Sequence, residues 1–189
     1  MSSSLIEKLC HVRHSQLLVI DIQDRLASAM PDKVLEKIIS NTQVLLTAAK
    51  ELDIPIVHSE QYPKGLGNTV TAIADHFPED TSVTKTSFSC SDAEGFNDLI
   101  STQKRQQIII TGMESHVCVL QTALQLQQKG YTVFVAEDAI CSRKKFNHKN
   151  ALKRLRQSGV VVSNVESILF EWLRDAAHPK FKTLSKLIK

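Results

Sequence analysis

The sequence contains no long apolar run. Among its 189 residues, no stretch approaches the roughly 18 consecutive apolar residues that a membrane-spanning helix needs, so we expect no membrane association. The first residues, MSSSLIEKLCHVRH, also lack the apolar stretch of a secretory signal. They are basic and Ser-rich, which leaves a transit peptide as an alternative, although Glu7 interrupts the pattern.

Paired cysteines are also missing. The chain has four cysteines, but no two form a CxxC pair and none stands at a zinc-binding spacing from a histidine. A chain of this length with 42% hydrophobic residues can fold without disulfide bonds. We therefore predict free thiols in a reducing compartment, the cytoplasm. The four are Cys10, Cys90, Cys118 and Cys141.

The charge balance does not indicate a polyanionic partner. The net charge is only +3, and the densest basic run covers residues 143–156. Within it Lys145, Lys149 and Lys153 recur every four residues, so they line one face of a helix. A solvated face is the preferred interpretation, and a phosphate-bearing ligand or nucleic acid is the alternative. Because no aromatic residues alternate with these lysines, we expect no nucleic-acid partner.

Short β-rich runs alternate with longer helical patterns along the chain. Several of the runs are almost continuously apolar, which is typical of parallel strands that helices cover on both faces. The expected strands span residues 17–21, 54–59, 82–85, 107–111, 131–136 and 160–163. The expected helices span residues 31–52, 68–76, 94–101, 115–129, 147–157, 167–177 and 180–188.

This alternation predicts a single α/β domain over residues 1–189. Its expected architecture is three-layered and Rossmann-like, with a doubly wound sheet of six parallel strands and helices on both faces. A dinucleotide-dependent oxidoreductase is disfavoured, because IDIQDRL stands at the end of the first strand where a GxGxxG motif would be required.

Three reactive side chains follow strands of the predicted sheet. In such sheets, ligands bind outside the carboxyl ends of the strands. Asp21 and Lys85 end the first and third expected strands, and Cys118 lies about one turn into the helix after the fourth. A helix N-terminus and a nearby cation both lower the pKa of a thiol, so we expect Cys118 to be the reactive cysteine. Taken singly, each has an ordinary alternative: a turn former, a surface lysine and a buried structural thiol.

Three segments resemble motifs of the isochorismatase-like cysteine hydrolases. They are LLVIDIQDRL around Asp21, VTKTSFS around Lys85, and IIITGMESHVCVLQTALQL around Cys118. The likeness runs from about residue 16 to 162, and the segments EQYPKGLGNTV and AAHPKFK look most like those of the isochorismatase-domain-containing proteins. Each motif alone is weak, but three in the right order at the ends of the right strands identify the family.

The resemblance implies a catalytic triad without a cofactor. In the family mechanism, the residue that matches Asp21 is the general base, and the residue that matches Lys85 lowers the thiol pKa. The residue that matches Cys118 attacks the substrate and forms a covalent intermediate. The family also has a cis peptide bond before a non-proline residue, which falls here between Met113 and Glu114. It implies an oxyanion site formed by the backbone N–H groups of Glu114 and Cys118.

One family motif is absent. Nicotinamidases of this family bind a metal through an Asp-x-His segment after the second strand, where this sequence has Gln61 and Pro63. Neither is a useful metal ligand, so we expect no metal. Loop residues near the binding edge set specificity, and the candidate substrate-binding residues are Gln23, Gln61, Tyr62 and Phe88.

The resemblance implies a hydrolase acting on a small molecule, with a C–N bond of an amide as the preferred target. An isochorismate-type enol ether is the alternative within the family, and a non-catalytic interaction domain on the same fold is the alternative outside it. The family also implies a homo-oligomer, at least a dimer. The apolar C-terminal segment could pack at that interface or cover its own core.

Overall fold

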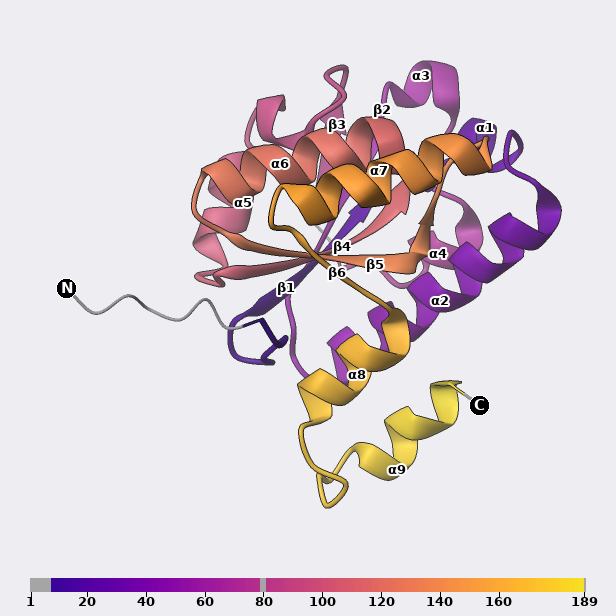
Figure 1. The fold of residues 1–189 in the computed structure, drawn as a ribbon. Coiled ribbons are helices and arrows are strands. Elements are labelled where there is room, and N and C mark those ends of the chain that lie inside the picture. Colours follow the sequence, from indigo (N-terminus) through magenta and orange to yellow (C-terminus); the bar gives the residue numbers. More distant parts are fainter. Residues whose placement is uncertain (1–7, 79–80, 189) are drawn as a thin grey trace.

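Six parallel strands form one sheet in the computed structural model, which describes residues 8–78 and 81–188 (Figure 1). The strand order is β3-β2-β1-β4-β5-β6, with every adjacent pair parallel. This confirms the doubly wound sheet, whose direction of winding reverses between β1 and β4. The strands are β1 (Ser15–Ile20), β2 (Ile56–Gln61), β3 (Ser82–Lys85), β4 (Gln107–Met113), β5 (Thr132–Cys141) and β6 (Val161–Ser163).

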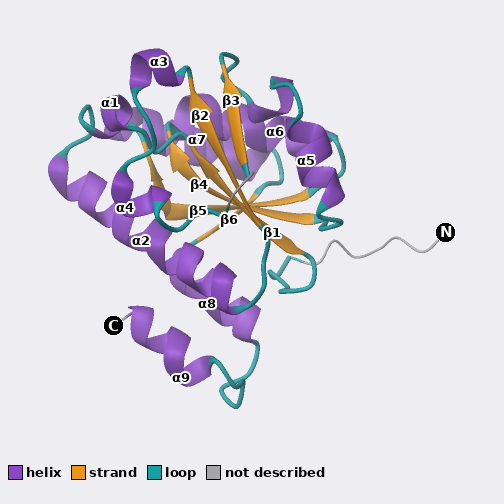
Figure 2. Cartoon of the chain, turned by 180° about the vertical axis from the view of Figure 1, so that it is seen from behind, coloured by secondary structure: helices purple, strands orange, loops and turns teal. Residues whose placement is uncertain are grey.

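Helices cover both faces of the sheet, as the apolar runs predict (Figures 1 and 2). One face packs against α5 (Phe96–Thr102), α6 (Leu120–Gln128) and α7 (Lys145–Gln157). The other packs against α2 (Asp32–Glu51), α8 (Val165–Leu173) and α9 (Phe181–Leu184). The short elements are α1 (Asp24–Ala27), α3 (Pro63–Leu66), α4 (Thr71–Ala74), η1 (Cys90–Asp92), η2 (Ser115–Val119) and η3 (Ser185–Ile188).

Alternate strand residues enter two separate cores. Leu17 and Val19 of β1 face the core under α2 and α8, whereas Leu18 and Ile20 face the core under α6 and α7. Burial of apolar surface on both faces provides most of the driving force for this arrangement. The C-terminal segment contributes Trp172 to the first of these cores, where its indole N–H donates a 3.0 Å hydrogen bond to the Ser15 hydroxyl.

Several boundaries differ from those predicted. The fifth strand continues past residue 136 to Cys141, because a register shift in its pairing with β4 places Ile140 beside Gly112. The second strand is displaced towards the C-terminus, so that Gln61 is the last residue of β2 and not part of a loop. The helix expected at 115–129 begins as the π-helical turn η2 before α6, and α8 ends at Leu173, short of the predicted 177. The single-turn helices α1 and α3 are too short to show a helical period.

A close backbone approach fixes the end of the sheet where β1 meets β4. Gly112 has φ +126, and a Cβ added there would lie 2.0 Å from the carbonyl oxygen of Ile20. The next residue after Ile20 is Asp21, which adopts a left-handed backbone conformation with φ 50. Only glycine allows this contact, so Gly112 sets the position of the Asp21 backbone.

In the segments 8–78 and 81–188, no helix combines the length and the apolar composition needed to span a bilayer.

Candidate functional site

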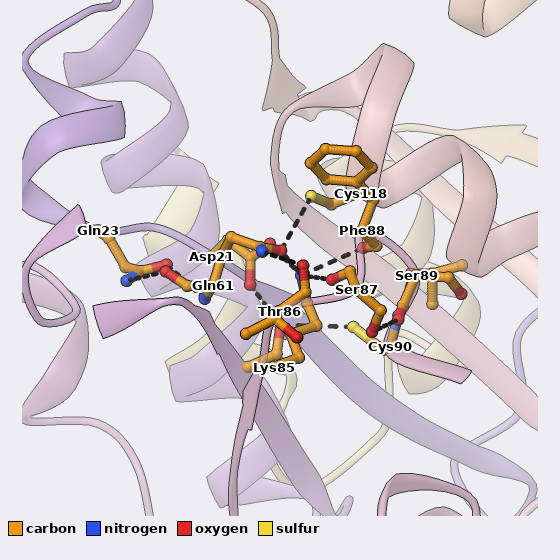
Figure 3. Close-up of polar contacts among 12 residues, drawn as sticks. Asp21, Gln23, Gln61, Lys85, Thr86, Ser87, Phe88, Ser89, Cys90 and Cys118 are labelled. Atoms are coloured by element: carbon orange, nitrogen blue, oxygen red, sulfur yellow. Dashed lines mark hydrogen bonds and ion pairs between the residues drawn. The ribbon is translucent and has the colours of Figure 1, made fainter. Parts of the chain in front are cut away.

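Three groups predicted from separate strands meet at the carboxyl edge of the sheet (Figure 3). Asp21 follows β1, Lys85 ends β3, and Cys118 lies in the π-helical turn η2 after β4. Nζ of Lys85 lies 2.7 Å from Oδ2 of Asp21, and both side chains are completely buried. Sγ of Cys118 lies 3.9 Å from Oε1 of Gln61, which accepts a 2.7 Å hydrogen bond from Lys85.

The Lys85 ammonium is surrounded by acceptors. Besides Asp21 and Gln61, it contacts the backbone carbonyls of Phe88 at 3.1 Å and Ser87 at 3.4 Å. Burial alone lowers the pKa of Lys85, but the negative charge of Asp21 and its hydrogen bond act in the opposite direction, and the net effect raises that pKa. Lys85 therefore stays positively charged.

Both oxygens of Asp21 are engaged. Oδ2 accepts from Lys85, and Oδ1 accepts a 2.7 Å hydrogen bond from the Ser59 hydroxyl. Burial raises the pKa of Asp21, and these two donors, together with Cys118, act in the opposite direction. A carboxylate with a raised pKa is a stronger base than one in water, which suits it to remove a proton.

The thiol of Cys118 is neutral in the unliganded site. Burial and the negative charge of Asp21 raise its pKa to about 12, and Lys85 only partly opposes them. The expectation of a lowered thiol pKa is therefore wrong for this state. The sequence pattern indicated the cation and the helix, but it did not show that Cys118 is only 5% exposed or that Asp21 already neutralises Lys85.

The backbone before the cysteine has the expected cis peptide bond between Met113 and Glu114. The Glu114 carbonyl accepts hydrogen bonds from the N–H groups of Val117 at 3.0 Å and Val119 at 3.3 Å, which hold the turn together. The Glu114 carboxylate pairs with Arg143 at 3.0 Å. The oxyanion role of the Glu114 and Cys118 N–H groups stays a prediction.

The candidate substrate-binding residues divide into two kinds. Gln23 is fully buried. Its side-chain oxygen accepts a 2.7 Å hydrogen bond from the backbone N–H of Gln61. Its side-chain NH₂ group donates to the backbone carbonyls of Gln61 at 3.0 Å and Gly67 at 2.7 Å. It therefore holds the end of β2 in place. Tyr62 and Phe88 are 54% and 56% exposed, and the ring of Tyr62 lies against Gly65 of α3. Their role in substrate binding stays a prediction.

Two groups behind Asp21 were not among the predicted site residues. The Cys90 thiol donates to the Ser59 hydroxyl at 3.4 Å, and that hydroxyl in turn donates to Asp21. The pKa of Cys90 is raised to about 11 by burial and by Asp21. Ser59 was detectable as a polar residue at the end of the second expected strand, whereas nothing in the local sequence distinguishes Cys90.

The residues replacing the family's metal motif have other contacts. Oε1 of Gln61 faces the Lys85 ammonium, and Pro63 begins α3. Across the described parts of the chain, no three His, Cys, Asp or Glu side chains are grouped so that they could hold a metal ion.

Comparison with known proteins finds relatives that carry the same domain. The family model described as the Isochorismatase domain matches residues 15–167. The secreted isochorismatase effector Isc1 of Phytophthora sojae is 38% identical, with 94% of this chain and 86% of that protein covered. The isochorismatase domain-containing protein 2 of Xenopus laevis is 39% identical, with 93% and 84% covered.

Solved structures share the fold. A structure described as the MAR1 ribonuclease of Caenorhabditis elegans is 36% identical, has a TM-score of 0.87, and covers 95% of this chain and 92% of its own. The YcaC gene product of Escherichia coli, described as an octameric hydrolase of unknown specificity, has a TM-score of 0.88 at 24% identity, with 95% and 89% covered.

Proposed function

Because this chain belongs to the isochorismatase family, we propose that it is a cysteine hydrolase that cleaves a C–N bond in a small amide. The observation that carries the proposal is the meeting of the Cys118 thiol, the Asp21 carboxylate and the Lys85 ammonium in one buried site. Their burial strengthens the electrostatic interactions among them and restricts the site to small substrates.

In the first step, Sγ of Cys118 attacks the carbonyl carbon of the amide while Asp21 takes the thiol proton. Because the thiol pKa is about 12 without substrate, the proton moves during the attack and no thiolate is stored beforehand. Asp21 then gives this proton to the leaving nitrogen, the C–N bond breaks, and the amine departs. A thioester on Cys118 remains.

In the second step, water attacks the thioester carbon and Asp21 accepts the proton of that water. The C–S bond breaks, the carboxylic acid leaves, and Cys118 regains a proton. The backbone N–H groups of Glu114 and Cys118 receive the negative oxygen in both tetrahedral intermediates. Lys85 keeps its charge throughout and holds Asp21 in position through their 2.7 Å contact.

The experiment supplies a panel of small amides and follows amine release, with intact-mass detection of an acyl group on the protein. Cys118→Ala is expected to abolish both signals. Cys10→Ala, which removes another buried thiol, is the matched control and is expected to keep both. Turnover that survives Cys118→Ala, or a wild-type protein inert to every amide, would refute the proposal.

Two further substrates separate the rival functions. Isochorismate tests the enol-ether alternative, and RNA is included because the C. elegans relative is described as a ribonuclease. Cleavage of either one with full activity in Cys118→Ala would assign the chain another chemistry. Absence of any turnover would favour the non-catalytic interaction domain.

We also propose that the protein works as a homo-oligomer. The E. coli structure that shares its fold is described as octameric, and Phe146 is a large apolar side chain that is 78% exposed in the isolated chain. Light scattering coupled to gel filtration measures the assembly, and a mass equal to one chain would contradict the proposal. The predicted cytoplasmic location is likewise a proposal, since the P. sojae relative is named as a secreted protein.

A further inference from the structure

The side-chain carbonyl of Gln61 lies inside the site, beside the thiol. Its Oε1 is 3.9 Å from Sγ of Cys118 and 2.7 Å from Nζ of Lys85 (Figure 3). Gln61 is buried at the end of β2. An atom this close to the sulfur lies within reach of a substrate group that is attached to the attacked carbon and turned towards it.

The orientation of this amide is fixed. Nε2 of Gln61 donates a 2.7 Å hydrogen bond to the carbonyl of Thr86. Turning the amide over would place its NH₂ group against the Lys85 ammonium and its oxygen against that carbonyl, which are two repulsive contacts. The Gln23 side chain accepts a hydrogen bond from the backbone N–H of Gln61 and donates one to the backbone carbonyl of Gln61. Gln61 therefore presents a hydrogen-bond acceptor to the thiol.

We propose, building on the function proposed above, that Gln61 is a specificity-determining residue that selects substrates with an N–H group on the nitrogen to be released. A carbonyl oxygen accepts two hydrogen bonds, and Lys85 supplies one. The reacting carbon sits about 3–3.5 Å from the sulfur before attack. A nitrogen one or two bonds from this carbon can come within about 3 Å of Oε1 when it is turned towards that oxygen, and this is the length of an ordinary N–H···O bond.

The same geometry disfavours esters. An ester places an oxygen where the amide has its N–H, so two oxygens with lone pairs face each other and the buried acceptor stays unpaired. In the unliganded site, the Cys118 thiol itself donates to Oε1. The substrate N–H replaces this donor, which leaves the thiol proton for Asp21. The selected class is carboxamides and ureides with at least one N–H.

The test uses two alkylating probes that differ in this group alone. Iodoacetamide and methyl iodoacetate each form a bond from their CH₂ carbon to Sγ with loss of iodide, while the thiol proton goes to solvent. Only iodoacetamide carries an N–H. The rates at Cys118 are measured by peptide mass spectrometry at alkaline pH, and their ratio is divided by the ratio for a free small thiol.

We expect Cys118 to prefer iodoacetamide about tenfold more than the free thiol does, the effect of one hydrogen bond. Gln61→Met, which removes the acceptor at similar volume, is expected to abolish the preference. Gln61→Glu, which retains an acceptor, is expected to keep it. The comparison of wild type with free thiol needs no variant, so it stands even if Gln61→Met fails to fold.

An equal preference in wild type and free thiol, or no labelling of Cys118 by either probe, would overturn the inference. The result is separable from that of the proposed function, because alkylation requires no hydrolysis. If Cys118 is labelled selectively but no amide is hydrolysed, only the proposed hydrolase function is contradicted. If amide hydrolysis depends on Cys118 but the labelling shows no selectivity, only the proposed role of Gln61 is contradicted.

Discussion

The Ser59 hydroxyl donates a 2.7 Å hydrogen bond to Oδ1 of Asp21, the oxygen that Lys85 does not contact. Ser59 itself accepts from the Cys90 thiol, so its proton is directed towards Asp21. Together with Lys85, Ser59 fixes the carboxylate plane and stabilises its ionised form. A group that acts only through Asp21 is a positioning residue, and its removal changes the titration of the carboxylate.

Ser59→Ala is expected to reduce kcat about tenfold, the effect of one hydrogen bond to a charged group. Loss of that bond raises the pKa of Asp21 further, so the acidic limb of the pH–rate profile moves to higher pH. Ser59→Thr, which keeps the hydroxyl, is expected to restore the limb. A lower rate with an unmoved limb would show that Ser59 has only a packing role.

Lys85→Met is expected to destabilise the fold by about 3–5 kcal/mol, because it leaves a buried carboxylate without its partner. Adding Asp21→Asn to this variant removes the unpaired charge and is expected to restore much of the loss. Denaturant unfolding of the two single variants and the double variant measures the coupling. Strict additivity of the two changes would contradict a direct interaction.

Asp21→Asn separates thiol ionisation from catalysis. The negative charge of Asp21 raises the thiol pKa of Cys118, so its removal is expected to move the midpoint of Cys118 alkylation below about 12. The proposed amide hydrolysis is expected to fall about 10²–10⁴-fold, since Asp21 is the general base of the proposed mechanism. If the alkylation midpoint rises, Asp21 is not the neighbour that keeps the thiol protonated.

His58 is expected to make stability depend on pH. Burial lowers its pKa from 6.5 to about 4, and its ring stacks on Phe77 at 3.8 Å. The unfolded chain therefore binds a proton near pH 6.5 that the folded chain binds only near pH 4. The contribution of His58 is complete above pH 6.5 and is lost as the pH falls towards 4.

Measured unfolding free energy in this interval is expected to have a shallower pH slope in His58→Gln than in wild type. One fully linked proton corresponds to about 1.4 kcal/mol per pH unit, and partial exposure of the ring reduces this value. Identical slopes in the two proteins would assign the pH dependence to other groups.

Gly112→Ala is expected to cost about 3 kcal/mol or more, because the added methyl group would meet the Ile20 carbonyl at 2.0 Å in a positive-φ conformation. Gly130→Ala is the matched control. Gly130 also has positive φ, at +93, but nothing lies within 4 Å of the added atom, so only the conformational cost of about 1 kcal/mol applies. Equal losses in thermal unfolding would show that the β1–β4 approach is not tight.

The sequence was informative where the candidate site is built from the ends of strands. Asp21 and Lys85 were predictable because each follows or ends an apolar run, and parallel strands bring their carboxyl ends to one edge. Cys90 was not, because its place behind Ser59 depends on a one-turn 3₁₀ helix without sequence period. The thiol pKa was predicted with the wrong sign, because desolvation depends on tertiary burial that no local pattern encodes.

The strand order has a consequence for how the proposed activity would be lost on unfolding. Lys85 and Asp21 reach each other only through β2, which pairs with β3 on one side and β1 on the other, and Cys118 joins through β4. A partly folded chain that lacks any of these ladders has no competent centre. Inactivation by denaturant should therefore coincide with cooperative melting of the sheet, so that enzymatic assay alone reports the native population.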